Sequence, residues 1–250
     1  PLVGNVLAEN APTLESVYPG LATGFLKSAT LAEMDEGTLL QGNEVAIQTS
    51  FAEKILGQAP PEIRKGLQKN MFFLLEQEAI QRFIEQDAEA MGISAKQPEK
   101  EMIQAYVSQL TKGLTVTEAE MRAFYDGNKE MVGDTPFEQV KGSIEPFLLQ
   151  QKKQQVVEAH IANLGKGAHV RLNRDWVKKH AVLARDNPVD RARMSGKPSM
   201  IEFGSTGCVP CDMMQPILEN LRKKFPDKLN VVFVHVGEDK MLGARFGIRV

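Results

Sequence analysis

The sequence predicts a mainly α-helical protein with a smaller α/β part near its C-terminal end. From Pro61 to Gly167, apolar residues recur at intervals of three and four, which is the spacing of one helical face. The pattern then changes: a short apolar run, Met200–Phe203, precedes a turn and a new helical pattern at Asp212–Phe225. A short apolar run followed by an amphipathic stretch indicates a buried strand and a helix, and therefore an α/β unit.

These patterns divide the chain into four predicted segments. Residues 1–45 are expected to hold short helices, because prolines and glycines break this acidic stretch at short intervals. Residues 46–172 are predicted to form a helical domain. Residues 173–197 are predicted to be a basic linker with a short helix, and residues 198–250 the α/β part.

Two of the four helices predicted in the helical domain precede residue 114. The first begins at Pro61, since proline is favoured in the first helical turn, and ends at Gly92. The second covers Glu99–Lys112 and stops at Gly113. The first of them is therefore expected to be an unusually long single helix.

The other two helices begin at recognisable signals. Thr117 and Glu120 have the spacing of a capping box, in which each side chain accepts a hydrogen bond from an otherwise unpaired backbone N–H. The last helix opens at Pro136 and ends at Gly165, and Pro146 is expected to kink it.

Basic residues dominate the predicted linker. Trp176 marks its short helix, while Asn187-Pro188 and Ser195–Pro198 have the composition of flexible boundaries. A solvated linker is the ordinary interpretation of such a stretch. A docking patch for acidic clients is the alternative.

Both cysteines of the chain, Cys208 and Cys211, lie two residues apart at the predicted start of a helix. Unpaired N–H groups and the helix dipole stabilise a thiolate there, and can lower a cysteine pKa from about 8.5 to about 7 or below. Cys208 is thus the predicted nucleophile. Cys211, one turn later, can attack the mixed disulfide that forms, so the pair can cycle between dithiol and disulfide.

A zinc site and a purely structural disulfide are the alternatives for this pair. Zinc usually takes four ligands, but there is no second cysteine pair. A disulfide across so short a loop would add little entropic stabilisation. The histidines also lack the spacing of a ligand pair: His160, His169, His180 and His235.

From Lys197 to Val250 the sequence resembles the thioredoxin family. That resemblance implies a thioredoxin-like α/β fold and thiol–disulfide exchange. It places Glu202 where the family carries a buried acid that takes and returns the proton of the resolving thiol, the alternative being an exposed strand residue. The matching stretches are Ser199–Phe203, Cys208–Cys211, Met213, Pro216–Leu218, Val231–Val234 and Arg245–Arg249.

Three departures from the family pattern bear on the expected activity. Gly207 replaces the tryptophan that usually precedes the first cysteine, and Phe233 replaces a common lysine. The sequence ends at Val250, before the family's cis-proline and last strands. We therefore expect a fragment, or a partner or second copy that supplies the missing strands.

Residues 45–172 resemble the chaperone domain of the SurA, PpiD and PrsA foldases. Only Glu130–Pro136 lies where those foldases commonly carry a parvulin domain, so no prolyl isomerase activity is expected. Together the two resemblances imply a mainly α protein, with a SurA-like helical chaperone domain followed by a partial α/β thioredoxin-like fold. The stretches that carry this second resemblance are Pro61–Ser94, Val116–Glu120, Phe124-Tyr125, Asn128-Lys129, Phe137–Val140, Ile144, Leu148–Lys152 and Ala168–Val170.

The function implied is that of an exported, periplasmic bacterial thiol–disulfide oxidoreductase fused to a client-binding helical domain. The alternative is a non-catalytic chaperone or assembly protein. Expected partners are unfolded or disulfide-containing protein clients, a redox partner protein and, in a homodimer, a second copy. Because the chain starts at Pro1, a removed signal peptide or a trimmed N-terminus is expected.

Composition argues against several other classes. A net charge of −2 gives no sign of nucleic-acid binding. No apolar run approaches the ~18 to 20 residues of a membrane span. No cofactor and no metal are expected.

Overall fold

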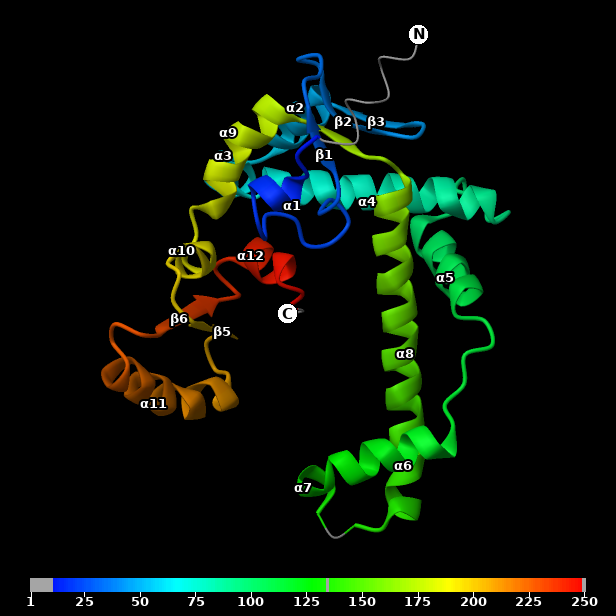
Figure 1. Cartoon of the computed structure of the whole chain (residues 1–250), viewed down its shortest axis with the longest axis vertical. Coiled ribbons are helices and arrows are strands. Elements are labelled where there is room, and N and C mark those ends of the chain that lie inside the picture. The colour runs from blue at the N-terminus through cyan, green and yellow to red at the C-terminus, as the bar shows by residue number, and fades with distance from the viewer. Residues whose placement is uncertain (1–10, 134, 249–250) are drawn as a thin grey trace. The chain divides into compact units, whose positions relative to one another are not determined.

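The computed structural model describes residues 11–133 and 135–248 (Figure 1). They divide into two compact units. The first combines residues up to Ala79 with those from Ala168 onward, and the second is the stretch between, Ile80–Gly167. Helix α4 (Met71–Ala90) begins in the first unit and ends in the second.

The first unit contains a four-stranded sheet in the order β1-β4-β2-β3. Strand β4 comes from the later chain segment. It pairs in parallel with β1 and antiparallel with β2, so that Leu172 lies opposite both Leu31 and Leu40. All three leucines are buried. The strands are β1 (Thr30–Ala32), β2 (Thr38–Gly42), β3 (Val45–Gln48) and β4 (Arg171–Asn173).

These strands differ from the short helices and loops expected for the N-terminal segment, of which only α1 (Leu14–Val17) is present in the described residues. Strands β2 and β3 form a hairpin in which Gly42 pairs with Val45, and Asn43 takes a positive φ of 45° in the turn. Asparagine tolerates this conformation well, and primed hairpin turns require it. Residues 1–10 of the expected N-terminal segment lie outside the described residues.

A buried carboxylate fixes the loop that precedes the sheet. Glu76 on α4 is fully buried and accepts hydrogen bonds from the backbone N–H groups of Thr23, Gly24 and Leu26, and from the Thr23 hydroxyl. A buried charge is tolerated only when its lone pairs are satisfied in this way. The loop and α4 are thereby joined.

The predicted long first helix is two helices. α3 (Pro61–Lys69) ends at Asn70, and α4 starts at the next residue. The Asn70 side chain donates a hydrogen bond to the Gly66 carbonyl at 2.9 Å, which satisfies a carbonyl at the end of α3. An asparagine side chain that forms a hydrogen bond with the nearby backbone can interrupt a helix. The spacing of apolar residues does not reveal such an interruption, so the sequence predicted one helix.

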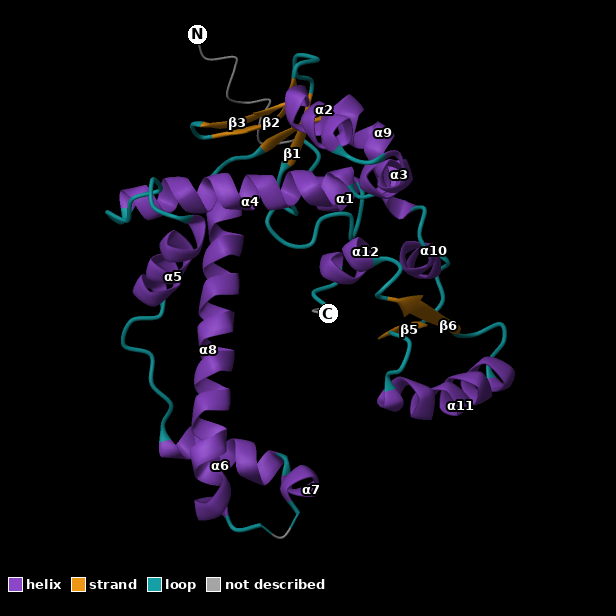
Figure 2. Cartoon of the chain, turned by 180° about the vertical axis from the view of Figure 1, so that it is seen from behind, coloured by secondary structure: helices purple, strands orange, loops and turns teal. Residues whose placement is uncertain are grey.

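The second unit consists of helices whose apolar faces form two clusters. One joins the end of α4 to α5 and α8 through Ala88, Met102 and Ile161. The other joins α6 to the first half of α8 through Met121 and Ile144. Figure 2 shows α5 and α6 beside α8 at two different levels. The helices are α5 (Glu99–Leu110), α6 (Glu118–Gly127), α7 (Lys129–Val132) and α8 (Phe137–Gly167).

Most helix boundaries in this unit agree with the sequence predictions. The capping box is formed: the Thr117 hydroxyl accepts from the Glu120 N–H, and the Glu120 carboxylate accepts from the Thr117 N–H. α8 continues through Pro146 and ends at Gly167. None of the helices in the described residues has the length and apolar character required to cross a bilayer.

The remaining elements of the first unit follow β3 and β4. The predicted linker contains two helices rather than one, and the second of them, α10, packs against the α/β part through Val189. These elements are α2 (Thr49–Gln58), α9 (Arg174–Arg185), α10 (Pro188–Met194), β5 (Ser199–Gly204), α11 (Val209–Lys224), β6 (Asn230–His235) and α12 (Lys240–Arg245).

Candidate active site

The α/β part is built on the parallel pair β5 and β6, with Ile201 opposite Val232 and Gly204 opposite His235. Alternate residues point to opposite faces of a strand, so one face presents Ile201, Phe203 and their partners. This face packs against Val189 of α10 and Leu242 of α12. The other face, which carries Glu202 and Phe233, is covered by α11 (Figure 1).

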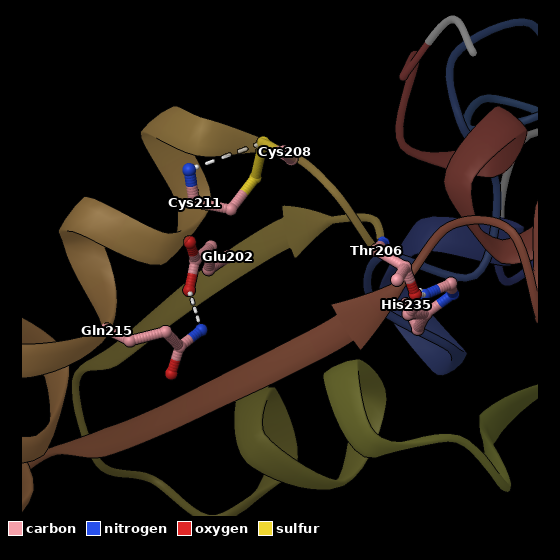
Figure 3. The surroundings of a disulfide bond; sticks show 6 residues. All are labelled: Glu202, Thr206, Cys208, Cys211, Gln215 and His235. Carbon is pink, nitrogen blue, oxygen red and sulfur yellow. Dashed lines mark hydrogen bonds between the residues drawn. A yellow bond between two sulfur atoms is a disulfide. The ribbon is translucent and has the colours of Figure 1, made fainter.

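The two cysteines lie at the beginning of α11 and form a disulfide bond (Figure 3). Cys208 is the N-cap of the helix, and its sulfur accepts the backbone N–H of Cys211 at 3.3 Å. Both residues are half-buried. The helix start thus directs an N–H group and the positive end of its dipole at the first sulfur, an arrangement that favours a thiolate when the pair is reduced.

Two glycines shape the approach to this pair. Gly207 directly precedes Cys208 and has a φ of +78°, a conformation that L side chains rarely adopt. At Gly204, a β-carbon would lie 2.7 Å from the Phe233 ring and 3.1 Å from the Cys211 sulfur. The replacement of the family's tryptophan by Gly207 therefore coincides with a turn that favours glycine.

Glu202 lies on β5 and faces α11. Its carboxylate accepts a hydrogen bond from the Gln215 side chain at 3.2 Å, and the residue is half-buried. Figure 3 shows it on the same side of the strand pair as Cys211. The structure brings all three predicted site residues, Cys208, Cys211 and Glu202, to the same face of β5 and the start of α11.

His235 and Thr206 also lie near the two cysteines, but the sequence did not predict them as site residues. Nε2 of His235 lies 3.1 Å from the Thr206 backbone nitrogen and 2.9 Å from its hydroxyl. The histidine is the last residue of β6, opposite the last residue of β5. The signal that could have found it is strand register. If β5 and β6 are aligned as parallel neighbours, His235 falls opposite Gly204, directly before the cysteine loop.

An exposed apolar stripe begins beside the cysteines and continues along α11. Val209, Met213 and Ile217 are spaced by four residues, and their exposed fractions are 67%, 72% and 56%. Residues at this spacing lie on one side of a helix. Within the described residues, no group of three or more histidine, cysteine, aspartate or glutamate side chains is arranged to hold a metal ion.

Comparison with known proteins finds one family in this part of the chain. The thioredoxin family model matches residues 181–250. Similar proteins include thioredoxins from Alicyclobacillus acidocaldarius, 33% identical over 63 residues, and from Rickettsia prowazekii, 33% identical over 55 residues. These alignments cover 25% and 22% of this chain and 60% and 52% of the two relatives.

The chain thus spans about half the length of the curated relatives that it matches, or slightly more. No solved structure matches it. The family match begins at residue 181, inside the stretch expected to be linker, and so includes α10, which packs on the strand pair. Residues 181–250 of this chain are a thioredoxin domain.

Proposed function

We propose that this protein is a thiol–disulfide oxidoreductase of protein clients, with Cys208 as nucleophile and Cys211 as resolving thiol. The observation that carries the proposal is the placement of Cys208 at the N-cap of α11 within a thioredoxin domain. A sulfur at this place is stabilised as an anion, and the thiolate is the form that attacks disulfides.

The reaction proceeds in two balanced steps. The Cys208 thiolate attacks one sulfur of a client disulfide; an S–S bond to the client forms, and the other client sulfur leaves as a thiolate. Cys211 then attacks the Cys208 sulfur, which releases the second client thiolate and leaves the Cys208–Cys211 disulfide. The client gains two electrons and the cysteine pair loses two. Run backwards, the same steps oxidise a client dithiol.

In this proposal Glu202 serves the second step. Cys211 must lose its proton before it can attack, and Glu202 lies on the same side of the strand pair (Figure 3). A carboxylate can accept that proton and return it when the pair is reduced again. The exposed stripe on α11 provides an apolar surface beside the cysteines for a client segment.

The broader proposal assigns client holding to the helical part and the exported compartment to the whole protein. It rests on the foldase resemblance of residues 45–172 and on the redox use of both cysteines of the chain. Disulfide exchange on secreted proteins takes place in oxidising compartments, which is consistent with such a site.

Insulin reduction and equilibration with glutathione test the redox proposal. The purified protein should reduce insulin with dithiothreitol as electron source, Cys208→Ser should abolish this, and Cys211→Ser should accumulate a mixed disulfide with the client. An unaltered rate in Cys208→Ser would refute the assigned nucleophile. A Cys208→Ser/Cys211→Ser double variant that still suppresses client aggregation would favour the separate holding role.

A further inference from the structure

A histidine from the second strand contacts the loop that leads into the nucleophilic cysteine. The Thr206 backbone N–H and hydroxyl lie 3.1 Å and 2.9 Å from Nε2 of His235 (Figure 3). Just beyond the strand pair, the Val236 N–H donates to the Gly204 carbonyl at 2.9 Å. The imidazole therefore sits where β5 ends and the cysteine loop begins.

The ring is also fixed from its other side. The Glu238 backbone N–H lies 3.2 Å from Nδ1. Gly237 provides the necessary room, because a β-carbon there would be 3.0 Å from Cε1 and 3.3 Å from Nδ1 of the imidazole. The side chain is thus held between the turn after β6 and the loop after β5.

Either neutral form of His235 can bond Thr206, but the position of the ring proton decides whether the backbone N–H or the hydroxyl takes part. A neutral imidazole has one donor and one acceptor nitrogen. If Nε2 is bare it accepts the Thr206 N–H, and if it carries a proton it donates to the Thr206 hydroxyl. In the charged ring Nε2–H still donates to the hydroxyl. The Glu238 contact survives only when Nδ1 is bare, so Thr206 is the more persistent partner.

We propose that His235 is a positioning residue for Cys208, which it holds at the start of α11 by anchoring Thr206, two residues earlier in the chain. The inference rests on the proposed thiol–disulfide function. Between the two residues lies only Gly207, whose backbone freedom would otherwise let the loop move. Loss of the anchor lets the sulfur leave the Cys211 N–H that it accepts at 3.3 Å, and so disfavours the thiolate.

Other ionisable groups near this site must be held constant in a test. Glu202 projects from β5, Glu238 and Asp239 follow in the turn after β6, and Asp212 lies in the first turn of α11. None of these is altered in the variants below. A change in cysteine reactivity then reports on the loop anchor.

The experiment measures alkylation of Cys208 by iodoacetamide against pH, in the full chain with Cys211→Ser to isolate one thiol. His235→Leu removes both hydrogen-bonding nitrogens, and should slow alkylation at pH 7 by about fivefold, the effect of one lost hydrogen bond. The midpoint of its pH profile should move upward. His235→Gln is the matched variant: its amide reaches the position of Nε2 and can donate or accept, so the profile should return towards that of the unmodified site.

Thr206→Val gives an independent reading, since it removes the hydroxyl and keeps the backbone N–H. Its effect should be smaller than that of His235→Leu, and the double variant should be no slower than His235→Leu alone. If His235→Leu does not fold by circular dichroism, His235→Phe takes its place, since its ring fills a similar space without hydrogen-bonding nitrogens, and an unchanged profile there contradicts the anchor. An unchanged profile in a folded His235→Leu, or equal losses in His235→Leu and His235→Gln, would also overturn the inference.

Alkylation needs no client, so the two proposals fail separately. A protein that does not reduce insulin but shows the predicted loss in His235→Leu and recovery in His235→Gln refutes the oxidoreductase proposal and supports the anchor. A protein that reduces insulin normally but has the same alkylation profile in all His235 variants supports the oxidoreductase proposal and refutes the anchor.

Discussion

At the residue scale, two glycines shape the surroundings of the cysteine pair, one through its backbone conformation and the other through the space that it leaves. Gly207 supplies the positive φ that turns the chain into Cys208, and Gly204 leaves room for the Phe233 ring and the Cys211 sulfur. The sequence alone predicts the cysteine pair as a candidate site, because its spacing and its place before a helix are local. It could not predict the role that we propose for His235, since this rests on a contact with Thr206, 29 residues away in the sequence.

Replacing Gly207 by alanine should destabilise the protein by about 1–2 kcal/mol, because a β-carbon at φ +78° contacts the following carbonyl. Gly66→Ala is the matched control. It lies in helix α3 with open space around it, so alanine there should be stabilising by about 0.5–1 kcal/mol. Urea unfolding of both variants measures the difference. Equal effects of the two substitutions would contradict the strain at Gly207.

Glu202→Gln tests the proton transfer proposed for Cys211. The amide keeps the size of the side chain and can still bond Gln215, but cannot accept a proton. The first attack on a client disulfide should keep its rate, whereas release of the mixed disulfide should slow by about 10²-fold. Asp212→Asn is the control, an exposed carboxylate in the first turn of α11, next to Cys211. Stopped-flow kinetics that show equal release rates in Glu202→Gln and the unmodified protein would exclude the role.

Glu120 should make the second unit sensitive to acid. A hydrogen bond from Lys152, with the two charges 2.6 Å apart, and the Thr117 N–H lower the pKa of Glu120 to about 2. Because the folded-state pKa is lowered, the stabilisation is present above the ordinary value of 4.5 and is lost as the pH falls towards 2. The difference in melting temperature between the unmodified protein and Glu120→Gln should therefore shrink from pH 5 to pH 2. A difference in melting temperature that stays constant between pH 5 and pH 2 would contradict the lowered pKa of Glu120.

At the element scale, the sequence predicted helix ends that are determined by residues close together in the chain. The capping box at Thr117 and the glycine after α5, Gly113, mark helix ends through local backbone geometry. The β2–β3 hairpin carried only a weak sequence signal, the apolar residues Val45 and Ile47 two positions apart after Gly42-Asn43. Strand β4 has three residues, and its partners lie about 130 to 140 residues away, so no local pattern could reveal it.

A buried ion pair joins helices α10 and α12 of the thioredoxin domain. Arg245 donates to Asp190 at 2.6 Å, and the two side chains are only 5% and 6% exposed. The same guanidinium donates to the Ala184 and Gly20 carbonyls. Such a group leaves several buried acceptors unpaired when it is removed.

Arg245→Ala should therefore cost about 3–5 kcal/mol of unfolding free energy, because the buried Asp190 charge keeps only the exposed Arg193, at 3.5 Å, as a cationic partner. Arg191→Ala is the control, from helix α10, which also carries Asp190. Its ion pair with Asp186 is exposed, so its loss should cost less than about 1 kcal/mol. Guanidinium unfolding compares the two variants. Similar losses of unfolding free energy in the two variants would contradict the idea that burial makes the loss of Arg245 more costly.

At the scale of the whole molecule, the chain leaves the first unit after Ala79, forms the second, and returns at Ala168. The four predicted segments follow the linear order of the sequence, but the first unit combines both ends of that order. Its sheet needs β4 between β1 and β2, and its α/β part needs α10 from the predicted linker. Hydrophobic periodicity describes single elements, and therefore does not report which distant segments share a core.

Leu172 tests whether the two sequence segments of the first unit depend on each other. The side chain is fully buried on the central strand β4, opposite Leu31 and Leu40, so Leu172→Ala should cost about 2–5 kcal/mol. Hydrogen exchange read by mass spectrometry should show lower protection both in β1–β3 and in β4, although more than 120 residues separate them in the sequence. Helix α5, whose core residue Met102 belongs to the second unit, should keep its protection.

Met102→Ala is the reciprocal control, expected to lower protection in α5 and to leave the sheet unchanged. A loss of protection confined to β4 in Leu172→Ala would contradict the shared sheet. A uniform loss through α5 would mean that the two units unfold as one.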